Sequence, residues 1–190
     1  STFSMIKRHC VFSRNALIAL NIPVLFKEIQ SIVDKGVPAP KIKVSDRAQM
    51  VMSYHIKFDE YEEERLAGKS FGSTKSGIAP FYSDKYAKIG FQVSELFDDD
   101  AALRDKVERV CETKNVTLEH LYHKPLLNPD DIMKELAEYK EMIAPYVCDV
   151  SLYLWNALKE GKEVLLEGQL GSLKDPDHGI YPIQARSEER

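Results

Sequence analysis

The chain has 190 residues, enough for one domain with a hydrophobic core. Hydrophobic residues make up 44% and charged residues 29%, an ordinary balance for a soluble globular protein that argues against wholesale disorder. Lys and Arg total 26 against 30 Asp and Glu, and the resulting net charge of -4 argues against a general nucleic-acid binder. A local cluster that holds a phosphate group stays compatible with that balance.

The cysteines and the hydropathy pattern indicate a reducing, aqueous compartment. Cys10, Cys111 and Cys148 lie far apart without CxxC spacing, so neither a disulfide framework nor a zinc site is indicated. No apolar run approaches the roughly 20 residues that span a bilayer, and the N-terminal stretch lacks a signal-peptide core. We expect reduced thiols and a cytoplasmic location.

The first part of the chain contains one clear helix signal and one strand signal. Asn21 is a suitable N-cap, Pro23 fits the first turn, and Lys35-Gly36 is a good C-terminal stop. The apolar residues expected on one face of this helix are Val24, Leu25, Ile29, Ile32 and Val33. Ile42-Lys43-Val44 is a candidate strand.

A second helix is expected over residues 54–67, with Ile56 and Tyr61 on its apolar side. The acidic run at residues 60–64 is most simply a solvated face of this helix. The composition then changes to Gly, Ser, Thr and Lys, which predicts a loop over residues 72–80.

Three further helices and a strand are expected in the C-terminal half. The helices cover about residues 99–113, a stretch that starts at Asn128 and breaks at Pro145, and about residues 146–160. Residues expected to face the core are Ala102, Leu103, Val107, Val110 and Cys111, then Ile132, Leu136, Tyr139 and Ile143, then Val147, Val150, Leu154 and Leu158. The apolar triplet 164–166 predicts a strand buried in a parallel sheet. This order indicates an α/β fold with a large helical insertion.

The segment GSTKSGIAP, residues 72–80, has the residue types that a phosphate site needs. Its glycines free the backbone, its hydroxyls and amides donate hydrogen bonds, and Lys75 adds positive charge. It is not a Walker A loop, because the lysine precedes the second glycine. On composition alone, a solvated flexible loop is an equal alternative.

A second polar segment, residues 167–179, follows the predicted strand at 164–166, where open α/β sheets place ligands. Gln169 can both donate and accept hydrogen bonds. Asp175, Asp177 and His178 resemble metal ligands, but residues so close together more often brace a turn.

The remaining histidines give little support for catalysis. His9, His55, His120 and His123 show no paired spacing with acids that would indicate a proton relay. His120 and His123 are three residues apart and could form a zinc pair, but a surface role is favoured because no third ligand is in view.

Two stretches carry a resemblance to a known family. FGSTKSGIAPFYSDKYAKIGFQVSELFD, residues 71–98, and LLEGQLGSLKDPDHGIYP, residues 165–182, resemble the signatures G-[TS]-T-x-x-G-I-G-P-x-Y-x-D-K and E-G-x-x-G-x-L-x-D-x-D-H-G-x-Y-P of adenylosuccinate synthetase. The resemblance covers residues 19–182, between a poorly matching segment 1–18 and a non-matching tail 183–190. It implies the central portion of a mostly parallel sheet with a large helical insertion, incomplete relative to the family domain.

The resemblance also implies a reaction. The family uses GTP and Mg²⁺ to ligate L-aspartate to IMP in purine (AMP) biosynthesis, and its members are homodimers. An aspartate takes the N1 proton of IMP, the 6-oxygen attacks the γ-phosphate of GTP, and the aspartate amine displaces the phosphoryl group. The family's GDEGKGK loop, with the catalytic aspartate and the first magnesium ligand, is not in these 190 residues. We therefore assign no catalytic and no metal residue and expect the isolated chain to be inactive. The alternative is a non-catalytic IMP-binding, phosphate-binding or dimerisation module.

The resemblance assigns substrate residues by position. Thr74 matches a threonine that contacts the IMP phosphate, and Lys88 stands where many members have an arginine that reaches the IMP of the other subunit. Gln169 stands one position before the usual IMP-binding glutamine, where this chain has Leu170. The further expected loop contacts are Ser73, Lys75, Gly168 and Gly171.

Overall fold

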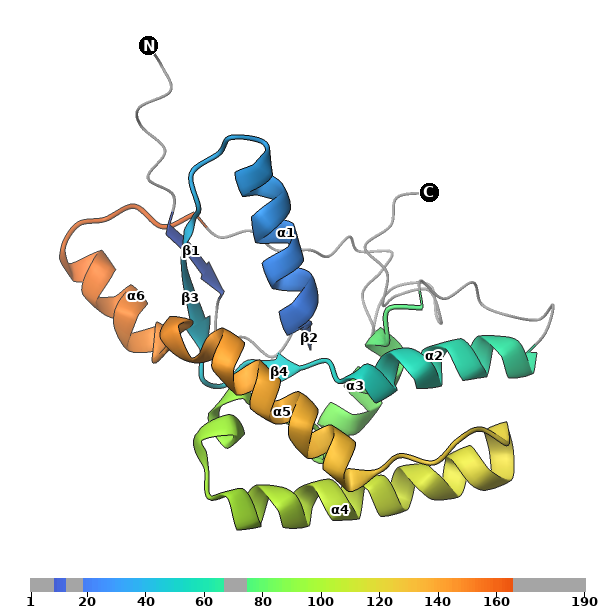
Figure 1. Ribbon diagram of the computed structural model, residues 1–190. Helices are drawn as coiled ribbons and strands as arrows, with labels where there is room; N and C mark the ends of the chain where they lie inside the picture. Colours follow the sequence, from blue (N-terminus) through green and yellow to red (C-terminus); the bar gives the residue numbers. More distant parts are fainter. Residues whose placement is uncertain (1–8, 13–18, 67–74, 166–190) are drawn as a thin grey trace, which may run out of the picture.

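The computed structural model describes residues 9–12, 19–66 and 75–165, the first of these ranges by its backbone only. Figure 1 shows a small sheet at one end of the molecule and a group of long helices at the other. Helix α1 stands on one side of the sheet and α6 on the other. This arrangement confirms the α/β fold class with a helical insertion.

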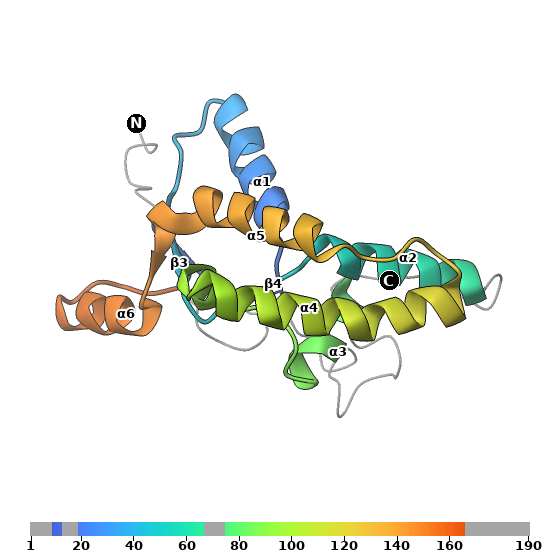
Figure 2. The ribbon, with the colours of Figure 1, turned by 60° about the horizontal axis from the view of Figure 1, so that its bottom comes forward.

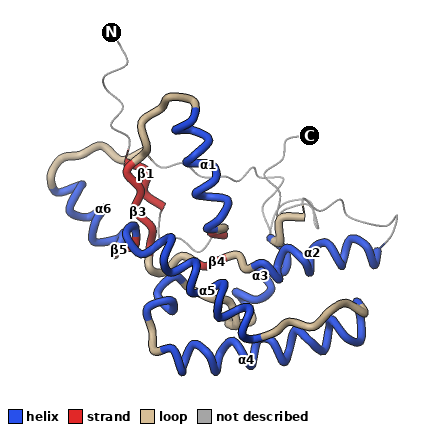
Figure 3. Tube along the Cα trace, in the orientation of Figure 1, coloured by secondary structure: helices blue, strands red, loops and turns tan. Residues whose placement is uncertain are grey.

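The sheet is parallel in all of its described pairings. Strands β1 (His9–Phe12), β3 (Lys41–Ser45) and β5 (Val147–Cys148) lie in the order β1-β3-β5, and Figure 3 shows them together in red. A separate parallel pair joins β2 (Ala19–Leu20) to β4 (Gln49–Met50). Val44 of β3 pairs with both neighbouring strands and is fully buried, so the predicted strand at residues 42–44 is confirmed.

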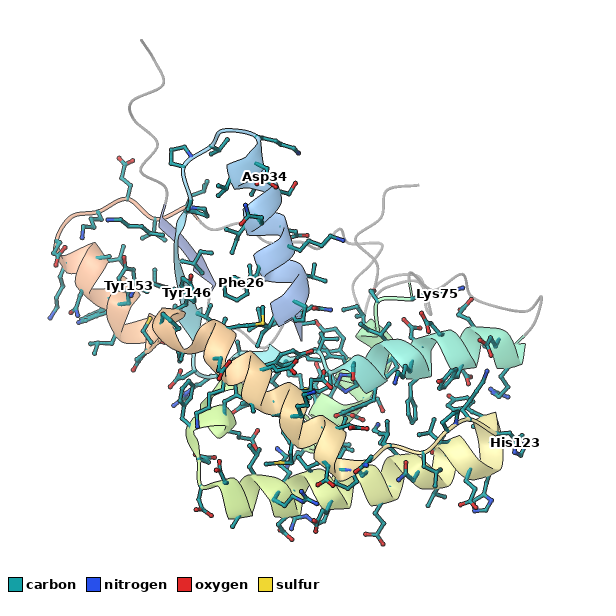
Figure 4. All side chains as sticks on the ribbon, viewed as in Figure 1. Phe26, Asp34, Lys75, His123, Tyr146 and Tyr153 are labelled. Carbon is teal, nitrogen blue, oxygen red and sulfur yellow. The ribbon has the colours of Figure 1, made fainter. Side chains whose placement is uncertain are left out.

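Helix α1 (Ile22–Asp34) has the ends that the sequence predicts. The Asn21 side chain accepts a hydrogen bond of 3.1 Å from the Val24 N–H, and Gly36, just beyond the helix, has a left-handed φ of 82°. The apolar stripe is narrower than expected, because Val24 and Ile32 are exposed while Leu25 is buried. One edge of the helix meets the core, where Phe26 packs against Tyr146 with ring centroids 5.4 Å apart (Figure 4).

The helical insertion lies between β4 and β5. It contains α2 (Ser53–Leu66), α3 (Ile78–Tyr86), a 3-10 helix (Val93–Phe97), α4 (Asp100–Thr117), a π-helix (Leu118–Tyr122) and α5 (Pro129–Ile143). Figures 1 and 2 both show α5 crossing above α4 toward α2. All four core residues predicted for α5 are buried, namely Ile132, Leu136, Tyr139 and Ile143.

Two predicted boundaries are wrong because local capping and tertiary pairing override the sequence pattern. Helix α3 begins at Ile78, inside the predicted loop 72–80. The helix predicted over residues 146–160 starts later, as α6 (Val150–Lys159), because Asp149 caps it and Val147 pairs in β5. The Asp149 carboxylate accepts a hydrogen bond of 3.0 Å from the Leu152 N–H.

The buried strand predicted at residues 164–166 is also wrong in the part that the structure describes. Val164 and Leu165 lie outside any strand, and Leu165 is 94% exposed. The two-residue strand β5, which the sequence pattern placed in a helix, occupies the position next to β3 instead. Leu166 lies outside the described residues.

Helix α2 has an inward face that the apolar pattern did not predict. Its buried residues are Tyr54, His55, Phe58 and Asp59, while Ile56 and Tyr61 are half-buried. The acidic run is not simply solvated either, because Glu62 accepts a 2.9 Å hydrogen bond from the Tyr122 hydroxyl. Burial and this carboxylate raise the pKa of Tyr122 to about 12. Across the described residues, no helix is long and apolar enough to cross a bilayer.

Candidate functional site

The described part of the glycine-rich motif is a strained turn in front of α3. Lys75 has a φ of 53° and Gly77, the N-cap of α3, a φ of 77°. A Cβ atom at Gly77 would lie 2.8 Å from both the carbonyl carbon of His55 and the backbone nitrogen of Ile56. Both the left-handed conformation and the close approach to α2 therefore require glycine at this position.

A buried carboxylate fastens this turn to α2. The Gly77 N–H donates a 2.9 Å hydrogen bond to Oδ2 of Asp59, a residue that is only 6% exposed. Lys75 and Ser76 are exposed on the segment that precedes this contact, and Figure 4 shows the Lys75 side chain on that segment. The turn is therefore fixed to α2 at Gly77 and carries an exposed cation at Lys75. That combination suits an anionic ligand.

A second buried network begins at His55, the residue whose backbone Gly77 approaches. Nδ1 of His55 accepts the Met52 N–H at 2.9 Å, so the ring proton sits on Nε2, which donates to Asp84 Oδ2 at 2.9 Å. Burial lowers the pKa of His55 despite the adjacent carboxylate, in agreement with a neutral imidazole. The other Asp84 oxygen accepts from the Lys114 ammonium group.

Asp84 is the ionised centre of this network. Burial by itself would raise the pKa of the Asp84 carboxyl, but the hydrogen bonds from His55 and Lys114 outweigh it and hold the pKa below its usual range. Because His55 belongs to α2, Asp84 to α3 and Lys114 to α4, the network joins three helices. The three residues His55, Asp84 and Lys114, called the brace below, hold α2, α3 and α4 together next to the turn.

A hollow of about 360 Å³ opens beside the brace, between α2, α3 and α4. Its lining residues are Phe58, Asp59, Glu62, Ala79, Pro80, Ser83, Lys114, Thr117 and Tyr122. Asp59 therefore borders the hollow as well as the turn. The charged groups Glu62 and Lys114 are already engaged, by Tyr122 and Asp84 respectively.

The predicted site lysines, Lys75 and Lys88, are not brought together. Lys75 precedes the N-terminus of α3, whereas Lys88 follows its C-terminus, is exposed and has a φ of 61°. The nine residues of α3 span roughly 13 Å at 1.5 Å per residue. Lys75 and Lys88 of one chain therefore lie beyond opposite ends of α3.

The other predicted contacts, Ser73, Thr74, Gly168, Gln169 and Gly171, lie outside the described residues, as do Asp175, Asp177 and His178. Their roles stay predictions.

His120 and His123 are exposed, and His123 ends the π-helix in a left-handed conformation. Glu119 is the acidic partner of His120, 3.6 Å from its Nε2. Figure 4 places His123 at the end of the molecule away from the sheet. Among the residues that the structure describes, no group of His, Cys, Asp and Glu has the arrangement of a metal site.

Sequence reasoning missed the pairing of His55 with Asp84, which lie 29 positions apart. The available signal was helical spacing: His55 shares one face of α2 with Phe58 and Asp59. A polar residue inside an apolar stripe indicates a buried partner, although it does not identify that partner.

The fold and the turn define a portion of an α/β domain with a candidate anion-binding segment. Residues 4–189 match the family model described as adenylosuccinate synthetase. The adenylosuccinate synthetases of Bacillus cytotoxicus and Bacillus subtilis are 42% and 41% identical to the chain over 163 residues. Those matches cover 86% of this chain and 38% of each relative, so the chain spans less than half the length of these proteins.

A solved structure shares the fold. The chain superposes on fully ligated adenylosuccinate synthetase from Plasmodium falciparum with a TM-score of 0.71 and 23% identity, over 91% of this chain and 39% of that one. The chain belongs to the adenylosuccinate synthetase family.

Proposed function

We propose that this chain supplies part of the IMP-binding surface of an adenylosuccinate synthetase, which ligates L-aspartate to IMP with GTP and Mg²⁺ in AMP biosynthesis. Family membership supports a ligase of purine biosynthesis. We further propose a cytoplasmic homodimer in which Thr74 contacts the IMP phosphate, Lys88 contacts the IMP of the second subunit, and Gln169 contributes to the same ligand. Ser73, Lys75, Gly168 and Gly171 complete the proposed contacts.

The observation that carries this proposal is the turn at Lys75 and Gly77. Two left-handed residues lie within a family signature, a cation is exposed there, and the turn is fastened to a buried carboxylate. A backbone held in this way keeps the exposed Lys75 in a fixed position, so that binding a phosphate there needs little reorganisation. A flexible loop, the alternative that composition left open, would not need a glycine against the backbone of His55.

The 190 residues themselves are expected to have no synthetase activity. They lack the GDEGKGK loop, which in the proposed mechanism provides the base that takes the N1 proton of IMP and the first magnesium ligand. Purified chain incubated with IMP, GTP, L-aspartate and Mg²⁺ should release no adenylosuccinate above background. Measurable turnover would contradict this expectation and place the base within these residues.

Replacing Thr74 by alanine is expected to weaken IMP binding by about tenfold, because one hydrogen bond to a charged group contributes roughly 1.5 kcal/mol. Calorimetric titration with IMP, and with inosine as the ligand that lacks the phosphate, measures the effect. Affinity for inosine should not change. Thr113→Ala, at an exposed position on α4, is the matched control.

The same titration separates the two functions that the sequence leaves open. Weak, phosphate-dependent binding to the wild-type chain supports a partial synthetase site. Tight binding of IMP by the chain alone supports a dedicated binding module instead. Equal binding of IMP and inosine would refute the phosphate assignment itself.

A further inference from the structure

We propose that Asp59 is a positioning residue for the phosphate-binding segment. By accepting the Gly77 N–H, it holds the 75–77 turn in the geometry that receives the phosphate of IMP. This inference rests on the proposed function and extends it to a residue that lies outside both family signatures. Asp59 acts through the Gly77 backbone and is assigned no contact with the ligand.

The turn needs an external restraint. A left-handed backbone is strained at a non-glycine residue such as Lys75, and the glycine at position 77 can adopt many other conformations. A hydrogen bond to a carboxylate is stronger than one to a neutral acceptor. The 2.9 Å bond from Gly77 to Asp59 therefore selects one conformation of the turn.

The helix that carries the Asp59 carboxylate is itself held in place by the brace. Asp59 lies one helical turn after His55, which is bonded through Asp84 to α3. Asp84 in turn binds Lys114 of α4, so the helix that bears Asp59 is fixed relative to the helix that begins at the turn. A turn held between two braced helices loses little conformational entropy when it binds a ligand. This is the physical basis of the positioning role.

Two substitutions at one position separate the hydrogen bond from the fold. Asp59→Ala removes the acceptor, whereas Asp59→Asn keeps an oxygen that can accept the Gly77 N–H. Asp34→Ala, at an exposed carboxylate on α1, is the matched control. For each variant of the full 190-residue chain, two quantities are measured: hydrogen exchange at the Gly77 amide by NMR, and calorimetric affinities for IMP and inosine.

With Asp59→Ala, exchange at Gly77 should accelerate about tenfold and IMP affinity should fall about tenfold, while inosine affinity stays unchanged. Asp59→Asn should keep most of the wild-type protection of the Gly77 amide and most of the wild-type affinity for IMP. Asp34→Ala should change neither quantity. Unchanged exchange and unchanged IMP affinity in Asp59→Ala would overturn the positioning role. A parallel loss of IMP and inosine affinity would also overturn it, because general destabilisation affects both ligands.

A failure of the proposed function gives a different result. If the wild-type chain binds IMP no better than inosine, the phosphate assignment is refuted, and exchange at Gly77 alone then decides the part played by Asp59. Acceleration in Asp59→Ala with recovery in Asp59→Asn supports its control of the turn. Equal exchange in all variants overturns it.

Discussion

Replacing Asp84 by alanine is expected to lower the free energy of unfolding by about 3 kcal/mol, a large share of the 5–15 kcal/mol that stabilises a typical domain. The substitution leaves the Nε2–H of His55, a fully buried residue, without its acceptor. It also removes the carboxylate that neutralises Lys114, whose side chain is only 12% exposed. An ammonium group in that position without a counter-charge is strongly unfavourable.

Urea denaturation of the variant and of three comparison proteins checks this expectation. Asp84→Asn keeps an acceptor for His55 but loses the charge, so its stability should be intermediate. The double variant Asp84→Ala with Lys114→Met removes both charges and should recover part of the loss. Asp130→Ala breaks an exposed ion pair with Arg104 and should cost less than about 1 kcal/mol. Equal stabilities for Asp84→Ala and Asp130→Ala would show that the brace contributes no more than an exposed ion pair.

Replacing Gly77 by alanine should be more damaging than replacing another glycine of the same backbone conformation. Gly77 and Gly36 have φ values of 77° and 82°. A Cβ at Gly77 would lie 2.8 Å from the backbone of His55 and Ile56, whereas a Cβ at Gly36 would meet nothing within 4 Å. Moving the backbone of α2 away from the new Cβ would cost free energy, because the brace holds this helix in place. The steric contact at residue 77 therefore adds to the strain of the left-handed backbone.

We expect Gly36→Ala to cost about 1 kcal/mol, from left-handed strain alone, and Gly77→Ala about 3 kcal/mol. The difference between their free energies of unfolding isolates the cost of the contact. Gly77→Ala should also lose phosphate-dependent IMP binding, because the turn must move away from α2. If the two variants are equally stable, the close approach of the turn to α2 is not present in solution.

Local patterns predicted the elements whose determinants lie within a few residues. Helix α1 is bounded by Asn21 and Gly36, and α5 buries residues at regular helical spacing. Strand β5 could not be predicted, because a pair of residues carries no period and its pairing with β3 is a tertiary interaction. The expected strand at 164–166 is wrong in its described part, because Val164 and Leu165, although apolar, pair with no strand among the described residues.

The candidate site likewise contains one part that a local motif indicated and one part that depends on tertiary packing. The glycine-rich motif made Lys75 a candidate contact because the residue types that suit a phosphate occur there in consecutive positions, whereas it did not single out Gly77 as the residue that approaches α2. The brace was missed because His55, Asp84 and Lys114 belong to three helices. Only the packing of α2 against α3 and α4 brings them within hydrogen-bond distance. No spacing pattern within a single helix predicts that these three side chains lie in contact.

The separation of Lys75 from Lys88 along α3 has a thermodynamic consequence. In the proposed dimer, the phosphate of IMP contacts Lys75 of one chain and Lys88 of the other, two residues that flank opposite ends of α3. Ligand binding and self-association would then be linked equilibria, so that occupancy tightens the dimer by the same factor by which dimerisation tightens occupancy. The apparent affinity for IMP would rise with protein concentration, and dilution alone would release the ligand.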